Sequence, residues 1–141
     1  MRVDLQHYRE SDYKEINDLW KLLGMGGKER GDDANIIQRT LKNGGVFFVA
    51  RTGADIIGTA WVTTDQRRLY LHHMGVHPDF QNQGIGTQML SKCIEWGEQT
   101  GLQMKLEVNP VNEVAVAVYE KAGFKRLGDY NVFIIRNYDL V

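Results

Sequence analysis

The sequence predicts a mixed α/β fold (an α+β mixed sheet), with about six or seven strands in one central sheet and about four helices. Segments with the period of a strand alternate with segments of helical spacing along all 141 residues. Two strand patterns, 46–51 and 56–64, are separated by a tight turn, which is typical of an antiparallel hairpin. In the second half a strand, a helix and a strand follow one another, which predicts a right-handed parallel crossover.

The first half contains most of the antiparallel part. Residues 3–8 alternate as a strand, and the next segment is a helix whose apolar positions are Tyr13, Ile16, Leu19, Trp20 and Leu23. Ser11 or Asp12 is its candidate N-cap. A glycine-rich polar loop, 24–33, leads into a short helix, 33–42, that Gly44-Gly45 ends. The hairpin and the strand 70–76 then complete three successive antiparallel strands.

The second half begins with an amphipathic helix, 83–100, whose apolar face contains Cys93. We expect a core thiol there, because no base is near it in sequence. Residues 102–109 alternate strictly and predict a half-buried strand. Asn112 is the predicted cap of a helix that ends at Gly123. Strand patterns at 124–127 and 132–138 predict a last hairpin.

Composition restricts the function classes. We expect one domain over residues 1–141, because this length suits a single core. The net charge of −1 gives no electrostatic basis for binding nucleic acid or a membrane surface. The single cysteine cannot form an internal disulfide, the N-terminus has no apolar signal region, and no apolar run reaches the roughly 18 residues of a spanning helix. We therefore expect a soluble cytoplasmic protein.

The stretch from Met74 to Thr87 carries the main functional signal. Pro78 stops the strand, and Gly84 and Gly86 then precede a helix, so backbone amides can approach an anion at the helix N-terminus. A phosphate is the expected ligand. A Rossmann loop would need a glycine where Met89 stands, and a P-loop would need Ser or Thr after the Gly-Lys at 27–28, where this chain has Glu.

Residues Gln81 to Gly86, after Val76-His77-Pro78, resemble the pyrophosphate loop of the GNAT superfamily of acyl-CoA-dependent N-acyltransferases. The second family signature matches Asn112, Ala115, Tyr119 and Gly123-Phe124. The resemblance implies a GNAT-like fold whose parallel strand pair splays around the cofactor, with acetyl-CoA as co-substrate. The implied cofactor-binding residues are Met74, Gly75, Val76, Gln81, Asn82, Gln83, Gly84, Ile85, Gly86, Thr87, Asn112 and Tyr119. Many relatives carry an arginine in this loop, and this chain has none there.

Acetyl transfer to an amine requires a base for the ammonium ion, stabilisation of the oxyanion and protonation of the thiolate. The resemblance implies Tyr119 as the acid; without the motif it would read as a core aromatic residue. It implies oxyanion stabilisation by a backbone amide around Met74 to Val76. Glu107 and His72 are both candidate bases, each matching a position used in part of the family, and the sequence leaves the choice open. In a regular strand His73 and His77 face away from His72, which argues against a metal site.

The expected function is direct transfer of an acetyl group from acetyl-CoA to a primary amine, either a small amine or a peptide or protein amino group. The alternative is a non-catalytic acyl-CoA-binding or regulatory module. By resemblance, the loop 24–33 and the region 130–137 form the acceptor site, where Glu29, Asp32 and Asp33 are candidates to attract a cationic amine. The expected partners are acetyl-CoA and the acceptor, and the expected state is a monomer or a homodimer.

Overall fold

The structure, a computed structural model, describes residues 2–141. The chain divides into two compact units, of which the first ends at Asn109 and the second is Pro110–Val141. The expectation of one domain stays a prediction. None of the helices formed by the described residues has the length and apolar composition needed to cross a bilayer.

The first unit is organised on one mixed sheet. Its strands are β1 (Asp4–His7), β2 (Val46–Thr52), β3 (Asp55–Thr64), β4 (Leu69–Val76) and β5 (Met104–Leu106), and their spatial order equals their chain order. Neighbours from β1 to β4 are antiparallel, whereas β4 and β5 are parallel. The mixed fold class and the single parallel pair are confirmed. The described residues form five strands, fewer than predicted.

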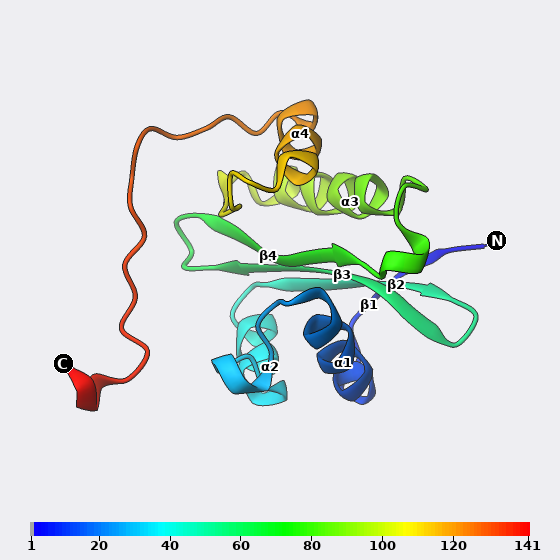
Figure 1. Ribbon diagram of the computed structural model, residues 1–141, viewed down its shortest axis with the longest axis horizontal. Helices are drawn as coiled ribbons and strands as arrows, with labels where there is room; N and C mark the ends of the chain where they lie inside the picture. Colours follow the sequence, from blue (N-terminus) through cyan, green and yellow to red (C-terminus); the bar gives the residue numbers. More distant parts are fainter. Residues whose placement is uncertain (1) are drawn as a thin grey trace. The chain divides into compact units, whose positions relative to one another are not determined.

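Helices cover both faces of this sheet (Figure 1). Helices α1 (Tyr13–Leu23) and α2 (Ala34–Lys42) lie on one face, and α3 (Ile85–Thr100) lies on the other. Beneath α1 and α2, the buried core includes Ile16, Trp20, Ile37, Phe47 and Trp61. On the α3 side, Met89, Leu90 and Cys93 are fully or almost fully buried, which confirms Cys93 as a core thiol. Burial raises the pKa of Cys93 to about 12, so it is unsuited to act as a nucleophile.

Local signals explain the starts of these helices with one exception. Asp33 caps α2, because its side chain accepts a hydrogen bond from the Ile36 amide at 2.9 Å. Asp12 precedes α1 but makes no capping bond. Its buried carboxylate instead accepts hydrogen bonds from Arg51 and from the Arg9 amide. Asp12 is therefore the N-cap residue of α1, one of the two predicted candidates, but its side chain does not bond the helix amides, because a buried arginine on β2 binds its carboxylate.

The parallel pair is short. Its register runs from Leu69 opposite Met104 to Leu71 opposite Leu106, while β4 continues to Val76. The predicted strand 102–109 is thus reduced to the residues that pair. Among the described residues, the later part of β4 pairs with β3 alone, so its other edge presents backbone groups that no strand satisfies.

The C-terminal unit contains α4 (Glu113–Ala122), capped by the Asn112 side chain and ended by Gly123 at φ 112°, as predicted. The predicted last hairpin is wrong: residues 124–137 form no strand, and one 3₁₀ turn follows at Tyr138–Leu140. The run Val132-Phe133-Ile134-Ile135 is continuously apolar and therefore specifies no sheet face or register. All four side chains are exposed.

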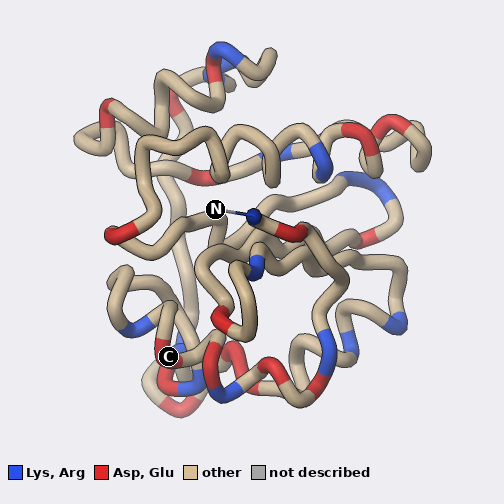
Figure 2. Tube along the Cα trace, turned by 90° about the vertical axis from the view of Figure 1, so that its right-hand side faces the viewer, with Lys and Arg blue, Asp and Glu red and all other residues tan. Residues whose placement is uncertain are grey.

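Acidic and basic residues are interspersed along the trace (Figure 2), in agreement with the near-zero net charge.

Candidate functional site

The segment after β4 is fixed at both of its ends. The His77 amide donates to the Ile57 carbonyl at 2.7 Å, and a 3₁₀ turn (Pro78–Phe80) follows. The side-chain amide of Gln81 donates to the Val76 carbonyl at 2.9 Å. Gln81 therefore folds back onto the end of β4 and holds the loop in place. The Gln81 side chain is therefore occupied by a contact within the chain.

That backbone turns sharply into α3. Asn82 has φ 64° and Gly84 has φ 80°, both in the left-handed region that favours glycine and asparagine. The first intrahelical bond runs from the Gln88 amide to the Gly84 carbonyl at 3.0 Å. The amides of Ile85, Gly86 and Thr87 therefore precede the hydrogen-bonded part of the helix and lie at the positive end of its dipole. A Cβ added at Gly84 meets no described atom within 4 Å, so the space beside the turn is open.

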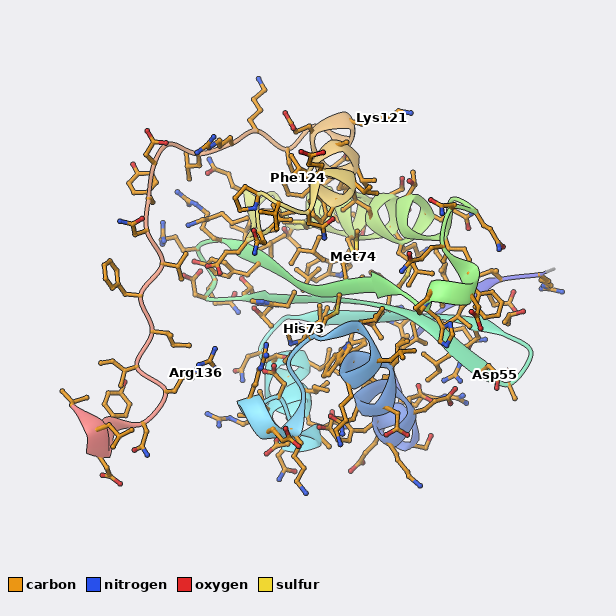
Figure 3. The ribbon with its side chains drawn as sticks, in the orientation of Figure 1. Asp55, His73, Met74, Lys121, Phe124 and Arg136 are labelled. Carbon is orange, nitrogen blue, oxygen red and sulfur yellow. The ribbon has the colours of Figure 1, made fainter. Side chains whose placement is uncertain are left out.

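The strand β4 contains a bulge. Trp61 pairs with His72 and Thr59 pairs with Gly75, so His73 and Met74 together face Ala60. His73 has φ 45°, an unusual value for this residue type. The prediction that His73 faces away from His72 assumed a regular strand and is wrong, since both rings contact Trp61, with centroids 5.7 and 5.8 Å away. Figure 3 places His73 on the α1 and α2 side and Met74 on the other.

Gly75, which has no side chain, directly follows the bulge. A Cβ at Gly75 would lie 2.5 Å from Met25 Cε and 2.9 Å from Leu23 Cδ1. The end of α1 and the loop 24–33 can therefore pack directly on β4 beside the two histidines. This contact brings the predicted acceptor loop to the strand that precedes the predicted phosphate loop.

His72, one candidate base, is partly buried on this face. Its Nε2 lies 2.8 Å from Thr63 Oγ1. Burial, followed by the charge of neighbouring His73, lowers the pKa of His72 below its ordinary value. At neutral pH the ring is therefore uncharged.

Glu107, the other candidate base, lies just beyond β5 and is exposed. Lys105 is opposite Tyr70 in the parallel ladder. The strand ends at Leu106, so Glu107 would share the face of Lys105, Tyr70 and His72 only if the alternation of β5 continued one residue further.

Sequence reasoning missed a pair on this face. Asp32 Oδ2 lies 2.8 Å from His73 Nε2. Burial acts to raise the pKa of Asp32, but the hydrogen bond and charge of His73, together with a backbone hydrogen bond at Gly27, hold that pKa below its ordinary value. The loop carboxylates are therefore not equivalent: Asp32 binds His73, Asp33 caps α2, and Glu29 is exposed. Strand alternation could not have signalled this pair, which depends on the bulge.

The two remaining predicted residues lie in the C-terminal unit. The Asn112 side chain accepts from the Ala115 amide at 3.2 Å and starts α4. Tyr119, near the end of this helix, is partly buried, and its ring lies 5.9 Å from that of Phe124. Among residues 2–141, no group of three or more His, Cys, Asp and Glu side chains is arranged to hold a metal ion.

Comparison with solved structures shows the fold. An aminoglycoside acetyltransferase, AAC(6')-Iy, solved with a CoA bisubstrate analogue, is 20% identical with a TM-score of 0.75, over 97% of this chain and 100% of that one. A predicted acetyltransferase from Clostridium acetobutylicum, solved with acetyl-CoA, is 19% identical with a TM-score of 0.76, over 94% and 96%. A GNAT-family acetyltransferase from Staphylococcus aureus Mu50 is 20% identical with a TM-score of 0.79, over 90% and 87%.

Family membership rests on the sequence match. The family model described as Acetyltransferase (GNAT) family matches residues 11–124, which include both helices over the first sheet face, the phosphate loop and α4. The bulged β4, the left-handed turn and the short parallel ladder lie within these residues. The chain therefore belongs to the acetyltransferase (GNAT) family.

Proposed function

We propose that the protein is an N-acetyltransferase that transfers an acetyl group from acetyl-CoA directly to a primary amine. The observation that carries this proposal is the turn from β4 into α3, where the amides of Ile85, Gly86 and Thr87 precede the first helical hydrogen bond. An anion with several phosphate oxygens is the ligand that such a turn binds without a cationic side chain.

Acetyl-CoA supplies this anion as its pyrophosphate. In the proposal, residues 81–87 surround the pyrophosphate, and the unpaired edge of β4 at Met74 to Val76 receives the amide-bearing pantetheine arm. A backbone amide of this edge stabilises the oxyanion, and Asn112 is a further cofactor residue. The CoA and acetyl-CoA complexes of the similar AAC(6')-Iy and the Clostridium acetyltransferase support this choice of co-substrate.

The acid and base follow from the chemistry. An alkyl ammonium ion has a pKa of about 10.4 and must lose a proton before it can attack the thioester. Glu107 and His72 are the two candidates that the sequence offers for this role, and His72 lies on the face opposite α3, where its ring contacts Trp61. Tyr119 donates a proton to the departing thiolate. Because the pKa of a thiol, about 8.5, lies below that of a phenol, this proton must be transferred while the C–S bond is breaking.

The test is acetyl-CoA-dependent release of the free CoA thiol across spermidine, neamine, tryptamine, free amino acids and short peptides with free N-termini. Neamine is included because a similar structure was solved with an acetylneamine bisubstrate analogue. Saturable turnover with one class, and an acetylated product confirmed by mass spectrometry, would establish the enzyme and its acceptor. Binding of acetyl-CoA by calorimetry without turnover of any probe would instead favour the non-catalytic module.

A further inference from the structure

We propose that His73 is the base that deprotonates the acceptor amine, and that Asp32 is its positioning residue. This inference rests on the proposed acetyltransferase function and adds a residue pair that the sequence did not indicate. The pair joins the predicted acceptor loop to the bulge of β4 through one hydrogen bond of 2.8 Å. About a fifth of the His73 side chain and a quarter of the Asp32 side chain are exposed.

The contact with Asp32 determines the tautomer of His73. An ionised carboxylate is only an acceptor, so Nε2 carries the hydrogen and donates it to Asp32. In the neutral ring the lone pair is therefore on Nδ1. Within residues 2–141, no hydrogen bond to Nδ1 is formed, and Nδ1 is not among the fully buried atoms that lack a partner, so it keeps some exposed surface to accept a proton.

The ring itself is held by packing. Trp20 contacts it edge-on with centroids 4.6 Å apart, and Trp61 contacts it at 5.8 Å. The backbone of Gly26 closes the Nε2 side, where an added Cβ would lie 2.8 Å from Nε2 and 2.4 Å from the bonded Asp32 oxygen. A side chain at 26 would therefore separate the pair. Gly26 allows the loop to approach the bulge closely enough for the hydrogen bond.

The strained backbone of His73 is fixed by a buried chain of hydrogen bonds. Trp20 Nε1 donates to Thr59 Oγ1 at 2.9 Å, and Thr59 Oγ1 donates to the His73 carbonyl at 2.7 Å. Trp20 and Thr59 have no exposed surface. On the other side, the backbone of Asp32 is held by two hydrogen bonds: its N–H donates to the Gly27 carbonyl at 2.9 Å, and the Tyr13 hydroxyl donates to its carbonyl at 2.8 Å. Strain that is held from several elements is typical of functional positions.

The proton balance uses two groups. The ammonium gives one proton to His73 Nδ1, and the neutral amine then forms the C–N bond at the thioester carbonyl. When the C–S bond breaks, Tyr119 protonates the thiolate and afterwards recovers the second amine proton. The imidazolium returns its proton to solvent, so the products are the amide, the free thiol and one proton. Asp32 keeps its charge throughout and stabilises the imidazolium.

The charged and aromatic groups that face His73 come from several elements. Asp32 approaches from the loop before α2, and His72 lies beside it on β4, with ring centroids 6.4 Å apart. From α1 and β3, the groups in contact are Trp20, Trp61 and Thr59, which do not titrate near neutral pH. Tyr13 reaches only the backbone of Asp32. Among residues 2–141, Asp32 is thus the one carboxylate in direct contact with the ring.

The test uses His73→Gly, because glycine accepts the φ of 45° without strain and leaves a hole of imidazole shape. With the acceptor found in the probe panel, kcat/KM should fall by about 10²- to 10⁴-fold, the range of general-base catalysis. Added imidazole should raise kcat/KM of this variant at least tenfold. Pyrazole, a ring of equal size that is a much weaker base, should not raise it. His7→Ala, an exposed histidine of β1, is the matched control and should keep its activity.

Asp32→Asn separates positioning from packing. Loss of the carboxylate removes the charge that stabilises the imidazolium, so the acidic limb of the kcat/KM profile should move to lower pH. Calorimetric affinity for acetyl-CoA should stay within about twofold. A variant His73→Gly that is folded by circular dichroism and retains wild-type kcat/KM would overturn the proposal, as would equal rescue by both rings or rescue by neither.

A measurement without any acceptor separates this proposal from the proposed function. Long-range ¹⁵N–¹H correlation spectra of the unmodified protein should show His73 as the Nε2–H tautomer, and Asp32→Asn should perturb that signal. An Nδ1–H tautomer would refute the base assignment even if the enzyme acetylates amines. Conversely, acetyl-CoA binding without turnover of any probe would refute the acetyltransferase function, and the base with it.

Discussion

Replacing Gly84 with glutamine tests whether the backbone turn before α3 binds the pyrophosphate. Gly84 has φ 80°, and Gly101, which ends the same helix, has φ 74°. An added Cβ meets no described atom within 4 Å at either position. Gly101→Gln is therefore a control with the same backbone strain at the opposite end of the helix.

The expected magnitudes separate stability from binding. A side chain in the left-handed region costs about 1–2 kcal/mol, so both variants should lose roughly 3–8 °C in Tm. Only Gly84→Gln places atoms beside the amides of Ile85, Gly86 and Thr87. Each hydrogen bond to a charged group contributes about 1.5–3 kcal/mol, so loss of two should weaken CoA binding by about 10²- to 10⁴-fold.

The assay is calorimetric titration with CoA and with pantetheine, which lacks the pyrophosphate. Gly84→Gln should weaken CoA binding and leave the weaker pantetheine binding unchanged, whereas Gly101→Gln should bind both as the unmodified protein does. If the two variants bind CoA with equal affinity, the phosphates do not lie on this turn, and the proposed cofactor site is wrong.

Three further predictions concern catalysis, stability and pH. Tyr119→Phe should lower kcat by at least about 10²-fold with CoA affinity within about twofold, while Tyr138→Phe, an exposed tyrosine of the same unit, should change neither in thiol-release and calorimetric assays. Arg51→Met should cost about 3–5 kcal/mol in urea unfolding, because it removes the buried cation from buried Asp12 and leaves only the exposed Arg9 guanidinium 3.9 Å away, and adding Asp12→Leu should recover much of this loss; a further loss would contradict the pairing argument. Burial lowers the pKa of His72, so below pH 6.5 the unfolded chain binds this proton more readily than the folded protein does. The stability that the neutral His72 ring contributes is therefore complete above pH 6.5 and is lost as pH falls through the lowered pKa. His72→Gln should therefore flatten the pH dependence of the urea midpoint below pH 6.5, and an unchanged slope would count against it.

The parts of the fold that depend on local chemistry could be predicted from the sequence. The hairpin of β2 and β3, the cap of α2 by Asp33 and the stop of α4 at Gly123 each depend on a few adjacent residues. The phosphate loop belongs to the same class, because Pro78 ends a strand and Gly84 permits the turn. These signals need no knowledge of distant neighbours.

The parts of the fold that depend on pairing partners distant in the sequence could not be predicted from it. Residues 102–109 alternate as one strand, but only Met104–Leu106 lie opposite β4 and form a ladder. The apolar residues of 124–137 have strand propensity, yet propensity reflects packing against a neighbouring strand, and no strand in the described residues pairs with them. The side-chain partner of Asp12 could not be predicted for the same reason, since Arg51 is distant in the sequence.

The bulge of β4 is the case with the largest functional consequence. One extra residue between the pairs of Trp61 and Thr59 reverses the side of the sheet to which His73 points. The cause lies outside β4, because Trp20 of α1 orients Thr59, and Thr59 binds the His73 carbonyl. A regular strand would direct His73 toward α3 and leave Asp32 without its partner. The contact between His73 and Asp32 therefore depends on tertiary contacts that periodicity within the strand does not contain.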